Sequence, residues 1–470
     1  MSSLHLPALL VVVPLLSAPL CAILPGRLSW LVAVVVSLAT LAITWVVHDR
    51  VLAEGVISYM IGNWPSPLGI EYRIDEANAF VLLLVAGIGA VVALWGRQSV
   101  VVEVGRRQER WYWTMYLLAL AGLLGVTITG DAFNVFVFLE ISSLASYVLI
   151  GFGRDRRALT AAYQYLIMGT IGATFFVIGV GLLYAMTGTL NMADLAVRLP
   201  LVEQMRPVHA AFAFLAVGIS LKLALFPLHL WLPNAYAFAP STTTTFLAAT
   251  ATKVAIYLFL RFFFSIFGGA EFFDKLPLAP VLIALSVAAI LVASTVAVFQ
   301  HNVKRMLAYS SVAQIGYITL GVGIASQTAL TGAIVHLFNH ALMKGALFVL
   351  VGGIAIRGGA ATIAGMAGLG RRMPWTMAGF VIAGLSMVGA PGTVGFISKW
   401  YLALGAIEAG WWWLAAIIVA GSLFPVVYLG RVVETAYFRV PTEATNGLRE
   451  PPADMLGFAL LLVVACVWFG

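Results

Sequence analysis

The sequence predicts an all-α polytopic membrane protein with about 14 transmembrane helices, and three observations support this fold class. The chain is 62% hydrophobic over its 470 residues. Only 10% of the residues are charged, whereas about a quarter are charged in a typical soluble protein. Apolar stretches of about 20 residues, the length of a helix that spans a bilayer, recur from one end of the chain to the other.

These apolar stretches give the expected spans in chain order. Their ranges are 6–24, 28–47, 76–95, 111–128, 131–151, 160–187, 208–227, 241–264, 277–299, 309–325, 328–356, 375–406, 411–431 and 455–470. The first is a span rather than a cleavable signal, because no basic residue precedes it and no signal-type cleavage site stands out. The last ends with the chain itself, as it would in a truncated sequence.

The basic residues indicate how the spans are oriented. When the loops are assigned alternately to two sides, one side holds sixteen arginines and lysines, Lys304 among them. The opposite side holds five, namely Arg50, Arg73, Arg198, Arg206 and Lys275. Basic residues gather on the cytoplasmic side, so we expect a multi-pass protein of a bacterial-type inner membrane with its N-terminus outside.

The sequence predicts no cofactor. Cys21 and Cys466 are the only cysteines, too few for an iron–sulfur cluster or a zinc site. No nucleotide-binding glycine motif is present. A metal bound by His336 and His340 would lack a third ligand in the sequence. The net charge of +7 follows the orientation of the spans, so we expect no nucleic acid partner.

Proline interrupts two of the predicted spans. The seventh contains LKLALFPLHLWLPNAY, with Pro227 and Pro233, and the twelfth contains LSMVGAPGTVGFISKW, with Pro391. Proline removes a helix hydrogen bond and clashes with the preceding turn, so both helices are expected to be broken there. Paired broken helices in halves of opposite topology are typical of inverted-repeat transporters.

This pairing gives the expected division of the chain. Residues 1–110 would form three N-terminal transmembrane helices, and residues 111–264 a first repeat of five helices that forms a half-channel. Residues 277–431 would form the second, inverted repeat, and residues 432–470 a cytoplasmic loop with the last helix. No soluble domain is predicted.

One glutamate and four lysines lie well inside predicted spans, away from their ends. They are Glu140, Lys222, Lys253, Lys344 and Lys399. All five as bare charges would cost about 12–18 kcal/mol, since one charge at the bilayer centre costs roughly 2.5–3.5 kcal/mol. A whole domain is stable by only about 5–15 kcal/mol. We therefore expect Glu140 to pair with Lys222, and buried lysines to exchange protons readily because burial disfavours their charged form.

The segment HLFNHALMKGALF places His336, His340 and Lys344 four residues apart along one helix. Each step advances about 6 Å along the axis and turns about 40°, so the three side chains share one face. Histidine exchanges protons near neutral pH. With water between its members, this ladder could carry a proton over about 12 Å of membrane depth.

At these residues the chain resembles the antiporter-like subunits shared by complex I, membrane-bound hydrogenases and Mrp-type cation/proton antiporters. The motifs that carry the resemblance are FLEISSLASY, SLKLALFPLHLWLPNAY, TATKVAIY, SVAQIGY, HLFNHALMKGALF and GFISKW. It implies inverted five-helix repeats and a proton relay. The implied roles are an ion pair for Glu140 and Lys222, a central connector for Lys253, an axial relay for His336, His340 and Lys344, and a terminal lysine for Lys399.

Within this family, the chain resembles the branch formed by the D-type subunits of Mrp antiporters. The similarity is carried by residues 130–196, from GDAFNVF to MADLA. Lys399 argues against the M-type subunit of complex I, which usually has a glutamate there, whereas the N and L types share the lysine. The L type would add a long amphipathic helix after its last spans.

The expected function is therefore proton translocation in a multi-subunit antiporter that exchanges Na⁺ or K⁺ for H⁺. The expected partners are other membrane subunits, protons, a monovalent cation and the lipid bilayer. We expect a secondary ion transporter subunit rather than an enzyme. The alternatives are a non-redox, proton-pumping subunit of complex I or a hydrogenase, the membrane partner of an inorganic-carbon uptake complex, and an inert assembly scaffold.

Overall fold

The computed structural model describes residues 5–268 and 278–470. Lys275 and the first residue of the span predicted at 277–299 lie outside this part of the chain. Within it, twelve helices are long and apolar enough to cross a membrane, and two shorter apolar helices cover Pro374–Val388 and Ala453–Trp468. Each of the fourteen predicted spans coincides with one or more of the helices, so the predicted fold class is confirmed.

The elements follow one another in an almost entirely helical chain. The helices of the first half are α1 (Leu6–Ile23), α2 (Gly26–Glu54), α3 (Glu76–Glu103), α4 (Glu109–Ile128), α5 (Ala132–Gly151), α6 (Arg157–Thr187), α7 (Met192–Arg198), α8 (Met205–Leu223), α9 (Trp231–Phe238), α10 (Ser241–Ala249) and α11 (Ala251–Leu260). Those of the second half are α13 (Leu278–Ala288), α14 (Ser294–Val298), α15 (Val303–Ile324), α16 (Gln327–Ile356), α17 (Leu369–Arg372), α18 (Pro374–Val388), α19 (Val394–Glu408), α20 (Trp412–Phe438), α21 (Glu443–Asn446) and α22 (Ala453–Trp468).

Short elements complete the fold. The strands β1 (Ile57–Met60) and β2 (Glu71–Ile74) pair antiparallel, with Ile57 opposite Ile74. Single 3₁₀ turns cover Ile61–Asn63, Leu199–Leu201 and Ala364–Met366, and π-helical turns cover Arg261–Ile266 and Ala289–Ala293.

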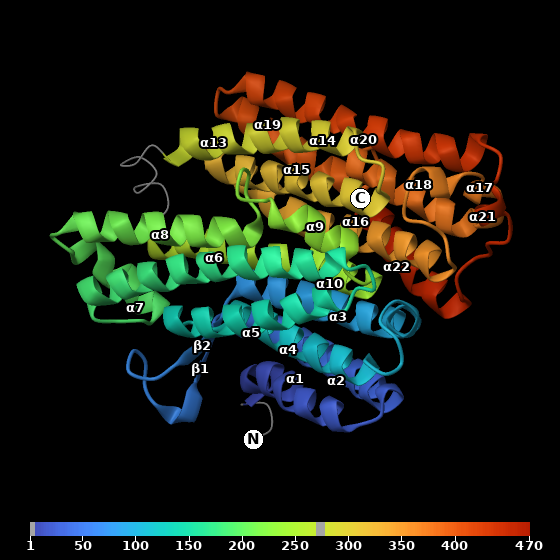
Figure 1. The fold of residues 1–470 in the computed structure, drawn as a ribbon. Coiled ribbons are helices and arrows are strands. Elements are labelled where there is room, and N and C mark those ends of the chain that lie inside the picture. The colour runs from blue at the N-terminus through green and yellow to red at the C-terminus, as the bar shows by residue number, and fades with distance from the viewer. Residues whose placement is uncertain (1–4, 269–277) are drawn as a thin grey trace.

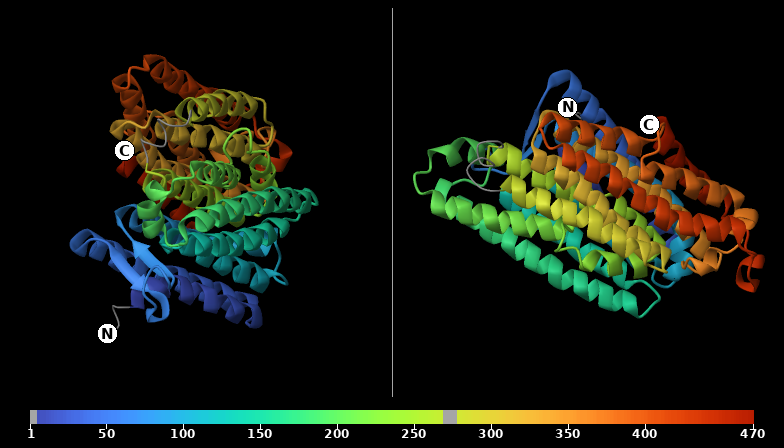
Figure 2. Two further views of the ribbon diagram at one scale, coloured as in Figure 1. Left: turned by 90° about the vertical axis from the view of Figure 1, so that its left-hand side faces the viewer. Right: turned by 90° about the horizontal axis from the view of Figure 1, so that it is seen from above.

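The long helices run side by side, and the chain progresses from α1 and α2 at one edge of the bundle to α19 and α20 at the other (Figure 1). The β1–β2 hairpin and α7 lie at one end of the helices, and α17 and α21 lie at the opposite end (Figure 1). The turned views show that the helices stay roughly parallel and that the second half stacks on the first (Figure 2). This arrangement exposes apolar side chains around the bundle and keeps polar loops at its two ends.

Small residues allow the closest helix contacts. A Cβ added at Gly218 of α8 would lie 2.7 Å from the carbonyl oxygen of Gly172 in α6. Such close backbone approach is typical of helices that pack within a membrane. Gly395 of α19 shows a tighter contact, since an added Cβ would lie 1.8 Å from the Ser386 carbonyl oxygen of α18.

The two broken helices that the sequence predicts are present, but one proline was misassigned. Helix α8 ends at Leu223, and the chain resumes as α9 at Trp231, with Pro227 in the break. Pro233 was expected to break the helix and instead lies in the first turn of α9. A proline is tolerated there because the first amides of a helix have no intrahelical acceptor.

The second predicted break separates α18 from α19 and contains Pro391. Gly389 and Gly392 have φ angles of +93° and +78°, which glycine adopts without steric cost. The division into two inverted repeats stays a prediction.

A third break, which the sequence analysis missed, separates α10 from α11 at Thr250. No proline marks it. Thr245 and Thr250 donate their hydroxyls to the carbonyls of Ser241 and Phe246, four residues earlier, at 2.9 and 2.6 Å. Threonine hydroxyls that bond back in this way compete with the helix ladder and often bend helices.

An ion pair connects the N-terminus of α3, which follows the β1–β2 hairpin, to the C-terminus of α11. Asp75 caps α3 by accepting from the Asn78 amide, and its carboxylate lies 2.6 and 2.7 Å from the Arg261 guanidinium. Burial raises the pKa of Asp75, but the hydrogen bonds and charge of Arg261 outweigh it and hold that pKa below its usual range.

Candidate functional site

Glu140 and Lys222 form the expected pair between α5 and α8. The Nζ atom of Lys222 lies 3.5 Å from Oε1 of Glu140 and also donates to the Ser143 hydroxyl at 2.7 Å. Ser143 lies on the same face of α5 as Glu140, three residues further along. The side chain of Lys222 is 5% exposed and that of Glu140 is 24% exposed, so the pair lies at the edge of the protein interior. Lys222 occupies the last turn of α8, directly before the break.

Lys253 lies at the third break and is fully buried. Its Nζ atom donates to the carbonyl of Ala248, one of the last of α10, and lies 3.4 Å from the Thr252 hydroxyl. The final carbonyls of a helix have no intrahelical donor, and a side-chain cation nearby is favourable. The break at Thr250 therefore supplies an acceptor for an amine in the middle of the bundle.

The histidine–lysine ladder lies on α16, and all three side chains are fully buried. His336 bridges two other helices, with Nδ1 2.8 Å from the Ser398 hydroxyl of α19 and Nε2 2.9 Å from the Gln314 side-chain oxygen of α15. Lys344 donates to the Leu307 carbonyl of α15 at 2.8 Å, and also to the Ser310 hydroxyl.

His340 connects the two ends of the ladder. Its ring lies 6.3 Å from the ring of His336, and the two rings are nearly parallel at 12°. In the described part of the chain, neither ring nitrogen of His340 has a hydrogen-bond partner. Along α16, His340 lies four residues from His336 on one side and four residues from Lys344 on the other.

Lys399 lies at the break between α18 and α19. Its Nζ atom donates to the carbonyls of Met387 and Val388, the last two residues of α18, at 2.9 and 3.0 Å. The same atom lies 5.0 Å from the ring centre of Tyr317, which also contacts the His336 ring at 5.8 Å. Tyr317 therefore joins Lys399 to the ladder.

The seven residues that the sequence singled out lie on α5, α8, α11, α16 and α19. Lys222, Lys253 and Lys399 lie close to the three helix breaks. Glu140 is the one carboxylate of the described residues in ion-pair range of any of the four lysines. Lys253, Lys344 and Lys399 have only carbonyl or hydroxyl oxygens as hydrogen-bond acceptors among these residues.

Lys304 was predicted to lie in a loop between two spans, and this placement in a loop was wrong. Lys304 is buried in the first turn of α15, and its Nζ atom donates to the Ala239 carbonyl at 3.1 Å. The nearby carboxylate of Glu103 accepts from the hydroxyl of Ser241 at 2.7 Å. The available signal was Asn302, which caps α15 and so places Lys304 inside the helix.

The family described as NADH:quinone oxidoreductase/Mrp antiporter matches residues 129–425, a range that contains all seven residues of the site. The chain belongs to this family. The resemblance inferred from the motifs is thereby confirmed, and the chain is an antiporter-like, multi-pass membrane subunit.

Two relatives carry different names. The chain is 42% identical to the N subunit of NADH-quinone oxidoreductase from Desulforudis audaxviator, over 99% of this chain and 95% of that protein. It is 32% identical to the D-type subunit of the Na⁺/H⁺ antiporter from Alkalihalophilus pseudofirmus, over 83% of this chain and 77% of that protein.

A solved structure gives the same fold. A chain of the membrane-bound sulfane sulfur reductase, an archaeal respiratory membrane complex, superposes with a TM-score of 0.90 and 32% identity over 99% of this chain and 94% of its own length. That structure is a multi-subunit complex, which supports other membrane subunits as partners here.

Proposed function

We propose that this subunit translocates protons across the membrane as part of a multi-subunit antiporter that exchanges a monovalent cation, Na⁺ or K⁺, for H⁺. The residues of the proposed relay are Glu140, Lys222, Lys253, His336, His340, Lys344 and Lys399. One observation carries the proposal. Three fully or nearly fully buried lysines bond only to neutral oxygens of the described chain, so they can lose a proton without breaking an ion pair.

Proton transfer would begin at the Glu140–Lys222 pair. While Glu140 is ionised, it stabilises the ammonium of Lys222 across 3.5 Å. When Glu140 takes up a proton, that stabilisation is lost and the buried ammonium becomes costly, so Lys222 releases its proton inward. Lys253, at the next break, is the proposed receiver.

The α16 ladder would carry the proton onward to the second break. His340 has no hydrogen-bond partner in the described chain, so transfer through its ring requires water on either side. His336 can pass a proton between its two ring nitrogens, which face different helices through Gln314 and Ser398. Lys399 would then release the proton beside the end of α18.

The membrane potential is large enough to drive these steps. It supplies roughly 2.3 kcal/mol per charge per 100 mV, which is comparable with the cost of one buried charge. The relay can therefore run in either direction, according to the cation gradient or voltage imposed on it.

Lys399→Arg tests whether proton release, rather than positive charge, matters. Arginine keeps the charge and can donate to the Met387 and Val388 carbonyls, but its guanidinium does not deprotonate. We expect cation-driven proton movement in everted vesicles to be lost while the subunit still assembles. Arg439→Lys is the matched control, because it replaces an arginine by a lysine at an exposed position, and it should leave transport unchanged. Normal transport by Lys399→Arg would refute a relay through this lysine.

A second candidate function is a proton-pumping subunit of a redox complex. The 42% identity to a protein named as the N subunit of NADH-quinone oxidoreductase favours it. The two functions differ in what drives the protons. In the first case, Na⁺ or K⁺ added outside vesicles that hold the native complex should enter in exchange for protons, so the lumen should become more alkaline. In the second, they should respond to an electron donor such as NADH, and the subunit should co-purify with iron–sulfur and flavin proteins.

A further inference from the structure

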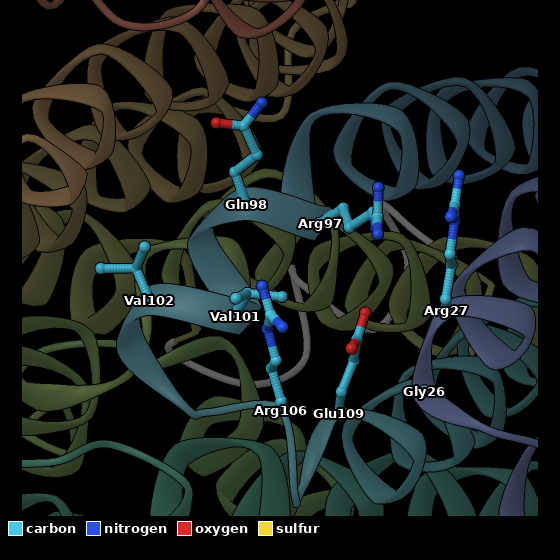
Figure 3. A pocket seen from close by; sticks show the side chains of 8 residues that line it. All are labelled: Gly26, Arg27, Arg97, Gln98, Val101, Val102, Arg106 and Glu109. Atoms are coloured by element: carbon cyan, nitrogen blue, oxygen red, sulfur yellow. The ribbon is translucent and has the colours of Figure 1, made fainter.

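A charged cavity lies at the end of the bundle opposite the β1–β2 hairpin, away from the relay. It opens between the start of α2, the end of α3 and the start of α4, and its volume is about 690 Å³ (Figure 3). The residues that line it are Gly26, Arg27, Arg97, Gln98, Val101, Val102, Arg106 and Glu109. Three arginines and one carboxylate thus share one hollow, so its net charge is positive.

Two buried polar atoms in this cavity lack partners. The Nε atom of Arg97 and the Oε1 atom of Glu109 have no hydrogen-bond partner in the described part of the chain. Figure 3 shows the side chains of Arg97, Arg106 and Glu109 converging from α3, the following loop and α4. Unpaired buried polar groups are rare, because each costs free energy until it is satisfied. The N–H group at Arg97 Nε is therefore a donor that an anion would satisfy, whereas the Glu109 oxygen is an acceptor that an anion does not satisfy.

The position of the cavity matches the headgroup level of a membrane. The guanidinium of Arg97 lies 5.0 Å from the ring centre of Trp30, and that of Arg110 lies 5.1 Å from the ring centre of Trp111. Tryptophan side chains collect where lipid tails meet headgroups. Val102, on the same rim, is exposed and apolar. The site thus offers a basic hollow and an apolar surface that acyl chains can follow.

From this arrangement we propose that the cavity binds the phosphate of an anionic phospholipid. The guanidiniums of Arg97 and Arg106 would hold the phosphate oxygens, since arginine binds phosphate through paired hydrogen bonds. The headgroup would fill the hollow, and its chains would lie along Val101 and Val102. Glu109 opposes the anion and limits how tightly it is held. The proposal is independent of which gradient or reaction drives the relay.

Native mass spectrometry of the purified complex tests this proposal. The probes are phosphatidylglycerol, zwitterionic phosphatidylcholine with the same chains, and inorganic phosphate. We expect one saturable phosphatidylglycerol adduct at concentrations where phosphatidylcholine gives none. Arg97→Gln and Arg106→Gln should each weaken it about fivefold, the equivalent of one basic residue near an anionic surface.

Arg107→Gln is the matched control, because Arg107 is exposed in the same loop and does not line the cavity. Glu109→Gln should instead tighten binding about fivefold, a gain that a misfolded variant could not produce. Equal binding of both lipids, or equal weakening by Arg107→Gln, would overturn the proposal. Displacement by equimolar inorganic phosphate would assign the site to a free anion, and absence of an adduct in the complex would assign it to a partner subunit. Both results would reject the lipid.

Discussion

Glu140→Gln removes the carboxylate that pairs with Lys222 of the proposed relay. Its oxygen lies 3.5 Å from Lys222 Nζ, a separation worth about 5 kcal/mol at an effective dielectric constant of about 20. The side chain of Glu140 is 24% exposed, and solvent screening reduces this value. The cost of one unpaired charge near the bilayer centre, roughly 2.5–3.5 kcal/mol, gives the lower bound.

Even the lower bound has a large kinetic effect. A change of about 2.5 kcal/mol corresponds to about 70-fold in an equilibrium constant. In Glu140→Gln, Lys222 can no longer be held as an ammonium and released on demand, so we expect proton movement to fall about 50-fold or more. The assay follows a fluorescent pH-gradient probe in everted vesicles after a cation pulse or an electron donor, whichever drives the native complex.

The control for this variant breaks an exposed ion pair by the same chemical change. Glu434→Gln separates Glu434 from Arg439, where both side chains are about 60% exposed and 3.4 Å apart. Exposed pairs contribute about 0–1 kcal/mol, so transport should remain normal. Glu140→Gln should still assemble, because glutamine has the same shape and Lys222 can lose its proton. Wild-type transport by Glu140→Gln would refute the reasoning.

Three further outcomes are expected. His340→Phe should change the free energy of unfolding by no more than about 1 kcal/mol, because no hydrogen bond to a described residue is lost. The same variant should abolish proton transport. Retained transport would remove His340 from the relay. Asp75→Asn should lower stability by about 1.5–3 kcal/mol through the lost Arg261 contact, equally at pH 6 and pH 8. A depressed carboxyl pKa keeps Asp75 ionised across that window, and its contribution fades only as the pH falls through the folded pKa; a loss that differs between the two pH values would contradict this. Gly395→Ala should lower the thermal midpoint by the equivalent of at least about 1–3 kcal/mol, because its Cβ would meet the Ser386 carbonyl at 1.8 Å; an unchanged midpoint would show that α18 and α19 can separate freely.

The spans and the relay residues could be predicted because the bilayer imposes simple rules. A helix that crosses the lipid needs about 20 apolar residues, so the membrane spans can be recognised in the sequence as long apolar stretches. A lysine such as Lys253 stands out in that background for the same reason. The cost of a buried charge predicted that Glu140 pairs with an ammonium, and the family resemblance implied that this ammonium is Lys222.

Other features could not be predicted, because they depend on contacts between distant segments or on side chains that compete locally with the helix hydrogen bonds. The break at Thr250 arises from hydroxyls that bond back along the helix, and many threonines in helices do so without breaking them. Pro233 looks like Pro227 in sequence, yet its place in the first turn of α9 makes it harmless. The burial of Lys304 depends on the Ala239 carbonyl, 65 residues away.

The ammonium groups at two helix breaks link protonation to backbone order. Lys253 and Lys399 each donate to terminal carbonyls, of α10 and α18 respectively. A charged donor holds a carbonyl roughly twice as strongly as a neutral one. Each departing proton therefore loosens the final turn of a helix, and each arriving one tightens it. The rate of amide hydrogen exchange in those turns should thus change with the protonation state of the neighbouring lysine.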